Sequence, residues 1–228
     1  MTNTIPDSAK QARLAPALKL NLGCGPVQPE GWVNVDGSNR ARLACYAPWL
    51  DALLVRMGLI SPTEFNRTVK VLNLFKPLPY ADQTVDAIYA GELWEHFEYP
   101  DSLKLTHECA RVLKPGGVLR VCVPDGPTFW RKYLEAHDRE MAKPPEQRDA
   151  KPLYDRTLMF FRDICTRRKL LGSMGHTHKW QFDEVQLVDM FQQAGLRSVD
   201  RARFHQSRIA DVAHVERSDF LIVEGVKP

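Results

Sequence analysis

Short apolar runs rich in β-branched residues alternate along the chain with longer stretches whose apolar residues recur at helical spacing. The first pattern is typical of buried strands and the second of amphipathic helices. The runs predicted as strands are residues 18–23, 33–36, 69–73, 85–90 and 118–123. The stretches predicted as helices are residues 41–58 and 101–113, the second ended by a "KPGG" sequence. This alternation predicts successive βαβ units and therefore a parallel sheet.

The pattern changes after the fifth predicted strand. Residues 126–171 are rich in aromatic residues, charges and helix formers, are broken by "KPPEQRDAKP", and show no strand pattern. We expect two helices there, within a helical cap that spans residues 126–180. An amphipathic helix follows in "FDEVQLVDMFQQAGL", and the apolar runs 197–204 and 218–226 are separated only by a loop. These last two runs are expected to pair as an antiparallel hairpin at the sheet edge.

Composition limits the class of protein. A chain of 228 residues with 44% hydrophobic content is expected to form one domain, residues 1–228. The net charge of +3 is too small to indicate nucleic-acid binding by itself. Five widely spaced cysteines without a CxxC pair favour a reducing compartment, hence the cytoplasm, and no zinc cluster. The polar N-terminus and the lack of a long apolar run predict neither a secretion signal nor a membrane span.

The stretch "LKLNLGCGPVQPEGWVNVDGS" carries a glycine turn and an acidic residue in close succession. A dinucleotide site needs a third glycine and an acid about 20 residues later. Here Asp36 follows Gly25 by only 11 positions, so a nicotinamide-dependent oxidoreductase fits poorly. A ligand with a ribose but no phosphate still needs glycines for close approach and an acid for its hydroxyls. S-adenosylmethionine has that chemistry, although the Gly-Cys-Gly tripeptide taken alone also fits a simple tight turn.

The segments that follow make the interpretation specific. "VLNLFKPLPYADQTVDAIYAGELWEHF" and "ECARVLKPGGVLRVCVPD" closely resemble the class I S-adenosylmethionine-dependent methyltransferases, especially the type 11 group with "NLGCG…GWVNVD". The resemblance is close over residues 18–125 and looser over the C-terminal helix and hairpin. It implies an α/β fold with a Rossmann-like, doubly wound, mostly parallel seven-stranded sheet. It also implies methyl transfer from S-adenosylmethionine.

By this resemblance, cofactor contacts come from residues at the ends of the predicted strands. They are Asn21, Gly23, Cys24, Gly25, Asp36, Asn73, Leu74, Gly91 and Glu92. Two adjacent ribose hydroxyls suit the carboxylate of Asp36, and an amide oxygen at Asn73 can accept a hydrogen bond from adenine. The family often carries an acid where this chain has Asn21 or Asn73. More of the binding of the methionine ammonium would therefore fall to Glu92 or to backbone carbonyls.

Catalysis needs little more than alignment, because a sulfonium is already an activated methyl donor. A hydroxyl acceptor must also lose its proton, and histidine is the side chain best suited to accept one near neutral pH. The candidates are His178, His176, His96 and Asp125. Structural roles remain open for each: the histidines could hold their loops in place, and Asp125 could cap the next helix. No metal site is predicted, because the two histidines of "GHTHKW" have no evident third ligand apart from Cys165 or Asp183.

The insertion is expected to set the acceptor. Its aromatic residues would either lie over the carboxyl ends of the strands, where open α/β sheets bind ligands, or form the core of the cap itself. These residues are Trp130, Tyr133, Tyr154, Phe160 and Phe161. A small-molecule or glycan acceptor with a hydroxyl or amine is expected, with neither a nucleic-acid nor a membrane partner. The alternative is a non-catalytic S-adenosylmethionine-binding or scaffold protein.

Overall fold

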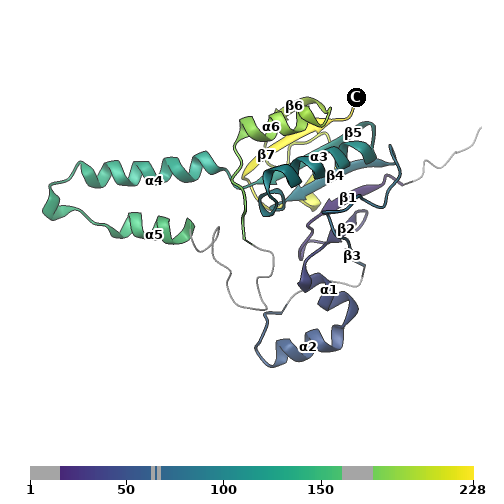
Figure 1. Cartoon of the computed structure of the whole chain (residues 1–228), viewed down its shortest axis with the longest axis horizontal. Coiled ribbons are helices and arrows are strands. Elements are labelled where there is room, and N and C mark those ends of the chain that lie inside the picture. Colours follow the sequence, from purple (N-terminus) through teal and green to yellow (C-terminus); the bar gives the residue numbers. More distant parts are fainter. Residues whose placement is uncertain (1–15, 63–64, 66–67, 161–176) are drawn as a thin grey trace, which may run out of the picture.

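The structure is a computed structural model that describes residues 16–62, 65, 68–160 and 177–228. A seven-stranded sheet lies at its centre, in the order β3-β2-β1-β4-β5-β7-β6 (Figure 1). The strands are β1 (Lys19–Leu22), β2 (Val33–Asp36), β3 (Lys70–Val71), β4 (Val85–Gly91), β5 (Leu113–Val123), β6 (Arg197–Arg201) and β7 (Leu221–Val226). β7 runs antiparallel to β5 and β6, and the remaining pairs are parallel. The predicted sheet with its antiparallel C-terminal hairpin is confirmed.

The central strands are buried on both faces of the sheet. In β5, residues 117–123 are all buried, which explains why this segment is apolar apart from Arg120. Successive side chains point to opposite faces, so Leu119 and Val121 join one apolar cluster while Val118 and Cys122 join another. The sheet therefore has two separate cores, one on each face.

The two faces are covered differently. Helices α3 (Tyr99–Val112) and α6 (Glu184–Gln193) bring Leu105 and Leu187 onto one face. The other face of β4 and β5 is covered by the segment between β6 and β7, which contributes Ile209 and Val212. That segment contains only a short 3-10 helix, η4 (Val212–His214). Apolar contacts and polar contacts with Arg120 of β5 both hold this segment against the sheet.

The region after β2 corrects one prediction. The single helix expected over residues 41–58 is two helices, α1 (Asn39–Tyr46) and α2 (Pro48–Arg56). Pro48 disfavours a helical conformation at the preceding residue, and Ala47 has φ −137° and ψ 59°. Within the described part of the chain, no helix combines the length and apolar character that a membrane span requires.

Two helices follow β5 and leave the body of the molecule. α4 (Gly126–Met141) and α5 (Lys151–Phe160) lie side by side and extend away from the sheet as an arm (Figure 1). Trp130 is 45% exposed and Tyr154 is 64% exposed, so these aromatics do not form a closed core within the arm. Phe161 and the side chain of Phe160 lie outside the described residues. The role of residues 126–180 as a cap stays a prediction.

Candidate active site

A cavity of about 440 Å³ opens at the carboxyl ends of β1, β2 and β4. In the sheet order, β2 and β3 lie on one side of β1 while β4 lies on the other, so the cavity sits where the strand order reverses. Open α/β sheets bind ligands at this switch point. The walls are formed by Gly23, Gly25, Pro26, Leu93, residues 36–39, 72–75, 91–92 and 95–97, and by His178 and Arg217 from the C-terminal part.

The turn after β1 is built from two glycines in left-handed conformations. Gly23 has φ +66° and Gly25 has φ +51°, values that L side chains rarely adopt. A β-carbon at Gly23 would also lie 3.1–3.2 Å from side-chain carbons of Leu93, which lines the cavity. The two glycines thus let the backbone turn back sharply at the cavity wall.

We expect Gly23→Val to abolish S-adenosylhomocysteine binding while the domain stays folded. The valine would force the turn out of its left-handed conformation and push Leu93 toward the ligand, at a local cost of roughly 1–3 kcal/mol. Calorimetric titration and a thermal melt measure both effects. Gly116→Val is the matched control, because Gly116 has φ +79°, no atom within 4 Å of an added β-carbon, and no part in the cavity. Normal binding by Gly23→Val would show that the turn does not hold the cofactor.

Asp36 links two loops of the cavity. Its Oδ2 accepts a hydrogen bond from the Gly25 N–H at 3.1 Å, and its Oδ1 accepts one from the Ser38 N–H at 2.8 Å. The residue is 7% exposed and lines the cavity. An ionised carboxylate has about four acceptor positions, so each oxygen retains capacity for one hydroxyl of a bound ribose.

Two of the predicted cofactor residues lie behind the cavity wall. Asn21 is buried, and its Nδ2 donates to the Val27 carbonyl oxygen at 2.9 Å and to Asn34 Oδ1 at 3.0 Å. Burial, and next the charge of Asp36, raise the pKa of the buried Cys24 thiol to about 12. Neither residue lines the cavity, whereas the other seven predicted cofactor residues do.

The loop after β3 forms an apolar wall. Asn73 Oδ1 accepts a hydrogen bond from the Phe75 N–H at 3.0 Å, which closes a tight turn. Leu74 is buried, and the rings of Phe75 and Phe97 have centroids 4.8 Å apart. Sequence reasoning identified Asn73 and Leu74 but missed the two phenylalanines, although Phe97 lies in the quoted "WEHF" motif.

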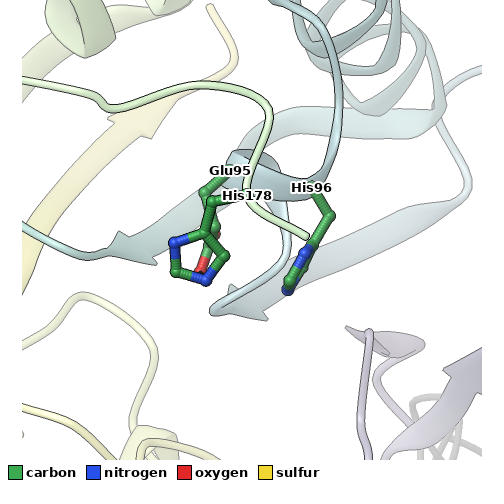
Figure 2. A group of neighbouring side chains, drawn as sticks. All are labelled: Glu95, His96 and His178. Carbon is green, nitrogen blue, oxygen red and sulfur yellow. Dashed lines mark ion pairs between the residues drawn. The ribbon is translucent and has the colours of Figure 1, made fainter. Parts of the chain in front are cut away.

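Glu95, His96 and His178 lie together at one end of the same cavity (Figure 2). Glu95 and His96 belong to the 3-10 helix η1 (Trp94–His96) that follows β4. The Glu95 carboxylate is buried, and neither oxygen has a hydrogen-bond partner among the described residues. Burial, assisted by the nearby charge of Glu92, raises the pKa of Glu95 to about 8. Sequence reasoning missed Glu95, although it stands between the tryptophan and histidine of "WEHF".

Backbone contacts hold the "HKW" segment against η1. The N–H groups of Lys179 and Trp180 donate to the Glu95 carbonyl oxygen at 2.7 and 3.2 Å. This places His178 Nε2 3.9 Å from Glu95 Oε1, with the two histidine rings 5.0 Å apart and nearly perpendicular. The structure thus brings together two of the predicted histidines and one carboxylate. His176 lies outside the described residues.

Asp125 has a structural explanation. Its carboxylate accepts hydrogen bonds from the N–H of Thr128 at 3.4 Å and from the Thr128 hydroxyl at 2.8 Å, which caps the N-terminus of α4. The residue does not line the cavity. The helix-cap alternative therefore accounts for its position.

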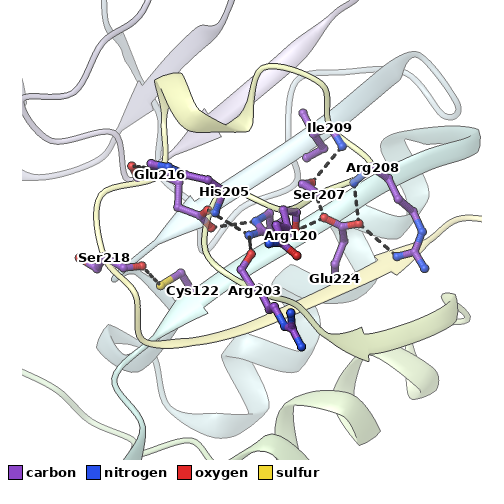
Figure 3. Close-up of polar contacts among 11 residues, drawn as sticks. Arg120, Cys122, Arg203, His205, Ser207, Arg208, Ile209, Glu216, Ser218 and Glu224 are labelled. Carbon is purple, nitrogen blue, oxygen red and sulfur yellow. Dashed lines mark hydrogen bonds and ion pairs between the residues drawn. The ribbon is translucent and has the colours of Figure 1, made fainter.

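A buried polar cluster fixes the segment between β6 and β7 (Figure 3). The Arg120 side chain, from β5, is fully buried and pairs with both carboxylate oxygens of Glu216 at 2.8 and 3.0 Å. It also donates to Glu224 at 3.1 Å and to the carbonyl oxygens of Gln206 and Arg203 at 3.0 and 2.8 Å. All five guanidinium N–H groups are satisfied in this way.

This cluster also positions part of the active site. Arg217 and Ser218 follow Glu216 directly in the chain. Arg217 lines the cavity and donates to the Gly23 carbonyl oxygen at 3.3 Å, while the Ser218 hydroxyl donates to the Glu92 carboxylate. Sequence reasoning missed Arg217, because no local motif connects it with the glycine turn.

Comparison with known proteins gives a family match over part of the chain. Residues 20–121 match the family model described as a methyltransferase domain, and a search of curated proteins finds no match. The chain is similar to a putative methyltransferase of Haloferax volcanii solved in complex with the Trm112 activator, at 16% identity over 96% of this chain and 86% of that one, with a TM-score of 0.45. It is also similar to a possible histamine N-methyltransferase of Thermotoga maritima, at 16% identity over 95% and 84% of the chains and a TM-score of 0.48. A further similar structure is an S-adenosylmethionine-dependent methyltransferase of Archaeoglobus fulgidus, at 13% identity over 92% and 86% and a TM-score of 0.49.

Proposed function

We propose that this chain, which carries a methyltransferase domain over residues 20–121, is a class I S-adenosylmethionine-dependent methyltransferase that methylates a hydroxyl or amine of a small-molecule or glycan acceptor. The observation that carries the proposal is the shared cavity: the glycine turn and Asp36 line one part of it, and Glu95, His96 and His178 line another. A single pocket therefore contains residues suited to binding the cofactor next to side chains that can accept a proton.

The residues present fit the cofactor. The left-handed glycine turn allows close approach, the Asp36 carboxylate suits the ribose hydroxyls, and the wall formed by Leu74 and Phe75 suits the adenine ring. Glu92 supplies a negative charge for the methionine ammonium. When bound, S-adenosylmethionine supplies a methyl group on a positively charged sulfur, so the protein mainly has to align the acceptor and exclude water.

The cluster of Glu95, His96 and His178 would serve the acceptor. A hydroxyl must lose its proton as the new bond forms, and imidazole accepts protons near neutral pH. The segment from Thr177 to Trp180 returns from the insertion directly to this end of the cavity. The arm formed by α4 and α5 belongs to the same insertion as this segment, which supports a role of residues 126–180 in selecting the acceptor.

We expect Asp36→Ala to weaken S-adenosylhomocysteine binding by roughly 1–3 kcal/mol, or about 5- to 150-fold in the dissociation constant. The substitution removes the ribose acceptor and releases the N–H groups of Gly25 and Ser38. Calorimetry measures the change. Asp86→Ala is the matched control: Asp86 also accepts a backbone hydrogen bond, from Leu18, but at the opposite end of β4. Unchanged affinity in a folded Asp36→Ala protein would remove Asp36 from the ribose site.

Turnover assays test the function itself. The protein is incubated with S-adenosylmethionine and panels of hydroxyl-bearing small molecules, amines and glycans, and formation of S-adenosylhomocysteine is followed. Methylation of one such class supports the proposal. Cofactor binding without turnover on any panel would favour the scaffold alternative. A cytoplasmic location is also proposed, on the wide spacing of the cysteines and the lack of a CxxC pair.

A further inference from the structure

We propose that Glu95, His96 and His178 bind a divalent transition-metal ion, and that the ion holds a hydroxyl oxygen of the acceptor. Metal binding is a property of the three side chains alone. Only the second half of the proposal, the hydroxyl on the ion, rests on the proposed methyl transfer. This second half restricts the proposed acceptors to compounds that carry a hydroxyl group.

The first support is the geometry of the cluster. One ligand atom from each residue can be chosen so that all three lie within 4.8 Å of one another. Ligand atoms at the usual distance of about 2.0–2.2 Å from one ion lie roughly 3–4 Å apart, so only small side-chain movements are needed. Figure 2 shows the two imidazole rings next to the Glu95 carboxylate. No other group of three such residues in the described part of the chain meets this criterion.

The second support is the buried carboxylate. Glu95 is 1% exposed, lines the cavity, and neither of its oxygens accepts a hydrogen bond from a described residue. An ionised carboxylate in such a place is costly unless it is paired or coordinates a metal. Glu92 lines the same cavity and adds a second negative charge nearby. A bound cation would pair with the Glu95 carboxylate, and Glu92 would remain available for the methionine ammonium.

The third support is the way the ligands are oriented. His96 Nδ1 lies 3.4 Å from the Thr177 carbonyl oxygen. The tautomer protonated on Nδ1 donates there and leaves the lone pair on Nε2 for a metal, as ligating histidines commonly do. The two N–H groups that bind the Glu95 carbonyl oxygen hold the segment of His178 against η1. His96 is therefore positioned by a backbone carbonyl of the His178 segment, and that segment is positioned by a backbone carbonyl of η1.

The donor set selects the kind of ion. Two imidazole nitrogens and one carboxylate suit Zn²⁺, Co²⁺ or Fe²⁺, whereas Mg²⁺ and Ca²⁺ prefer oxygen ligands. Three protein ligands leave a position for substrate, and all three residues face the cavity. A metal-bound hydroxyl is more acidic than a free one. Its O–H bond would break with release of the proton to water, and its oxygen would take the methyl group as the carbon–sulfur bond breaks.

Metal binding can be measured on the 228-residue chain without any acceptor. The protein is stripped with a chelator and titrated with Zn²⁺ by calorimetry and with Co²⁺ by visible absorption, with Mg²⁺ for comparison. We expect one tight Zn²⁺ site and weaker Mg²⁺ binding. His178→Ala, His96→Ala and Glu95→Gln should each lower Zn²⁺ affinity by about 100-fold or more, since loss of an outer partner alone costs roughly 10–100-fold.

Two controls separate the claims. His137→Ala, which removes an exposed histidine 3.1 Å from a carboxylate of Asp138, should leave Zn²⁺ affinity unchanged. Asp36→Ala should lower S-adenosylhomocysteine affinity but not Zn²⁺ affinity, and His178→Ala should do the reverse. Thermal melts identify any variant that fails to fold. Equal Zn²⁺ affinity in the wild type and in all folded cluster variants would overturn the metal proposal while leaving methyl transfer intact. If the protein binds the metal but methylates no acceptor, the metal site is supported and the proposed methyl transfer is contradicted.

Discussion

His178→Ala is expected to lower kcat by roughly 10² to 10⁴ while S-adenosylhomocysteine affinity stays nearly constant. His178 lines the cavity 3.9 Å from Glu95, in the part of the cavity that we propose for the acceptor. The substitution removes the imidazole that acts on the acceptor, but it leaves Asp36 and the wall formed by Leu74 and Phe75 in place. The expectation holds whether the imidazole accepts the proton itself or binds the proposed ion.

The measurement combines turnover, S-adenosylhomocysteine calorimetry and a thermal melt once an acceptor is known. His176→Ala is assayed in parallel, because sequence reasoning left open which histidine of "GHTHKW" acts. His214→Ala is the control, since His214 is exposed in η4 and does not line the cavity. If His178→Ala melts earlier yet its folded fraction turns over normally, the histidine only holds its loop in place, and the catalytic proposal is wrong.

Arg120→Met should destabilise the protein by about 3–5 kcal/mol, because it leaves the Glu216 carboxylate buried without its counter-charge. The side chains of Arg120 and Glu216 are both 0% exposed. For a domain of this size, that loss lowers the melting temperature by roughly 6–20 °C. Urea unfolding followed by circular dichroism measures the free energy directly. Cofactor affinity should fall as well, because Arg217 and Ser218 follow the released glutamate.

Two further variants test the cause of the Arg120 effect. Adding Glu216→Gln to Arg120→Met removes the unpaired charge but keeps an acceptor for the His205 N–H, so part of the stability should return. Lys151→Met breaks an exposed ion pair with Asp155 in the arm and should change stability by less than about 1 kcal/mol. Equal effects of Arg120→Met and Lys151→Met would contradict a structural role for the buried cluster.

Local pattern explains which parts of the fold could be predicted. The strands β1, β2 and β4 came within two residues of their predicted bounds, because short runs rich in apolar and β-branched residues and bounded by turn residues are typical of strands. The helix over residues 41–58 was wrong, since its apolar spacing hid the break that Pro48 imposes. On that helix pair Tyr46 and Trp49 are 74% and 71% exposed, so apolar spacing did not indicate burial there.

The sequence alone determined the glycine turn, the acid at the end of β2 and the alternation of strands and helices along the chain. These features depend on short spacings, such as the 11 positions that separate Gly25 from Asp36. Only the tertiary structure decided which distant groups meet. It joined His96 to Thr177 across 81 positions, Arg120 to Glu216 across 96, and Gly23 to Arg217 across 194. Such contacts follow from the order in which strands pair and from how the segments between them return to the sheet, and no periodicity along the chain encodes them.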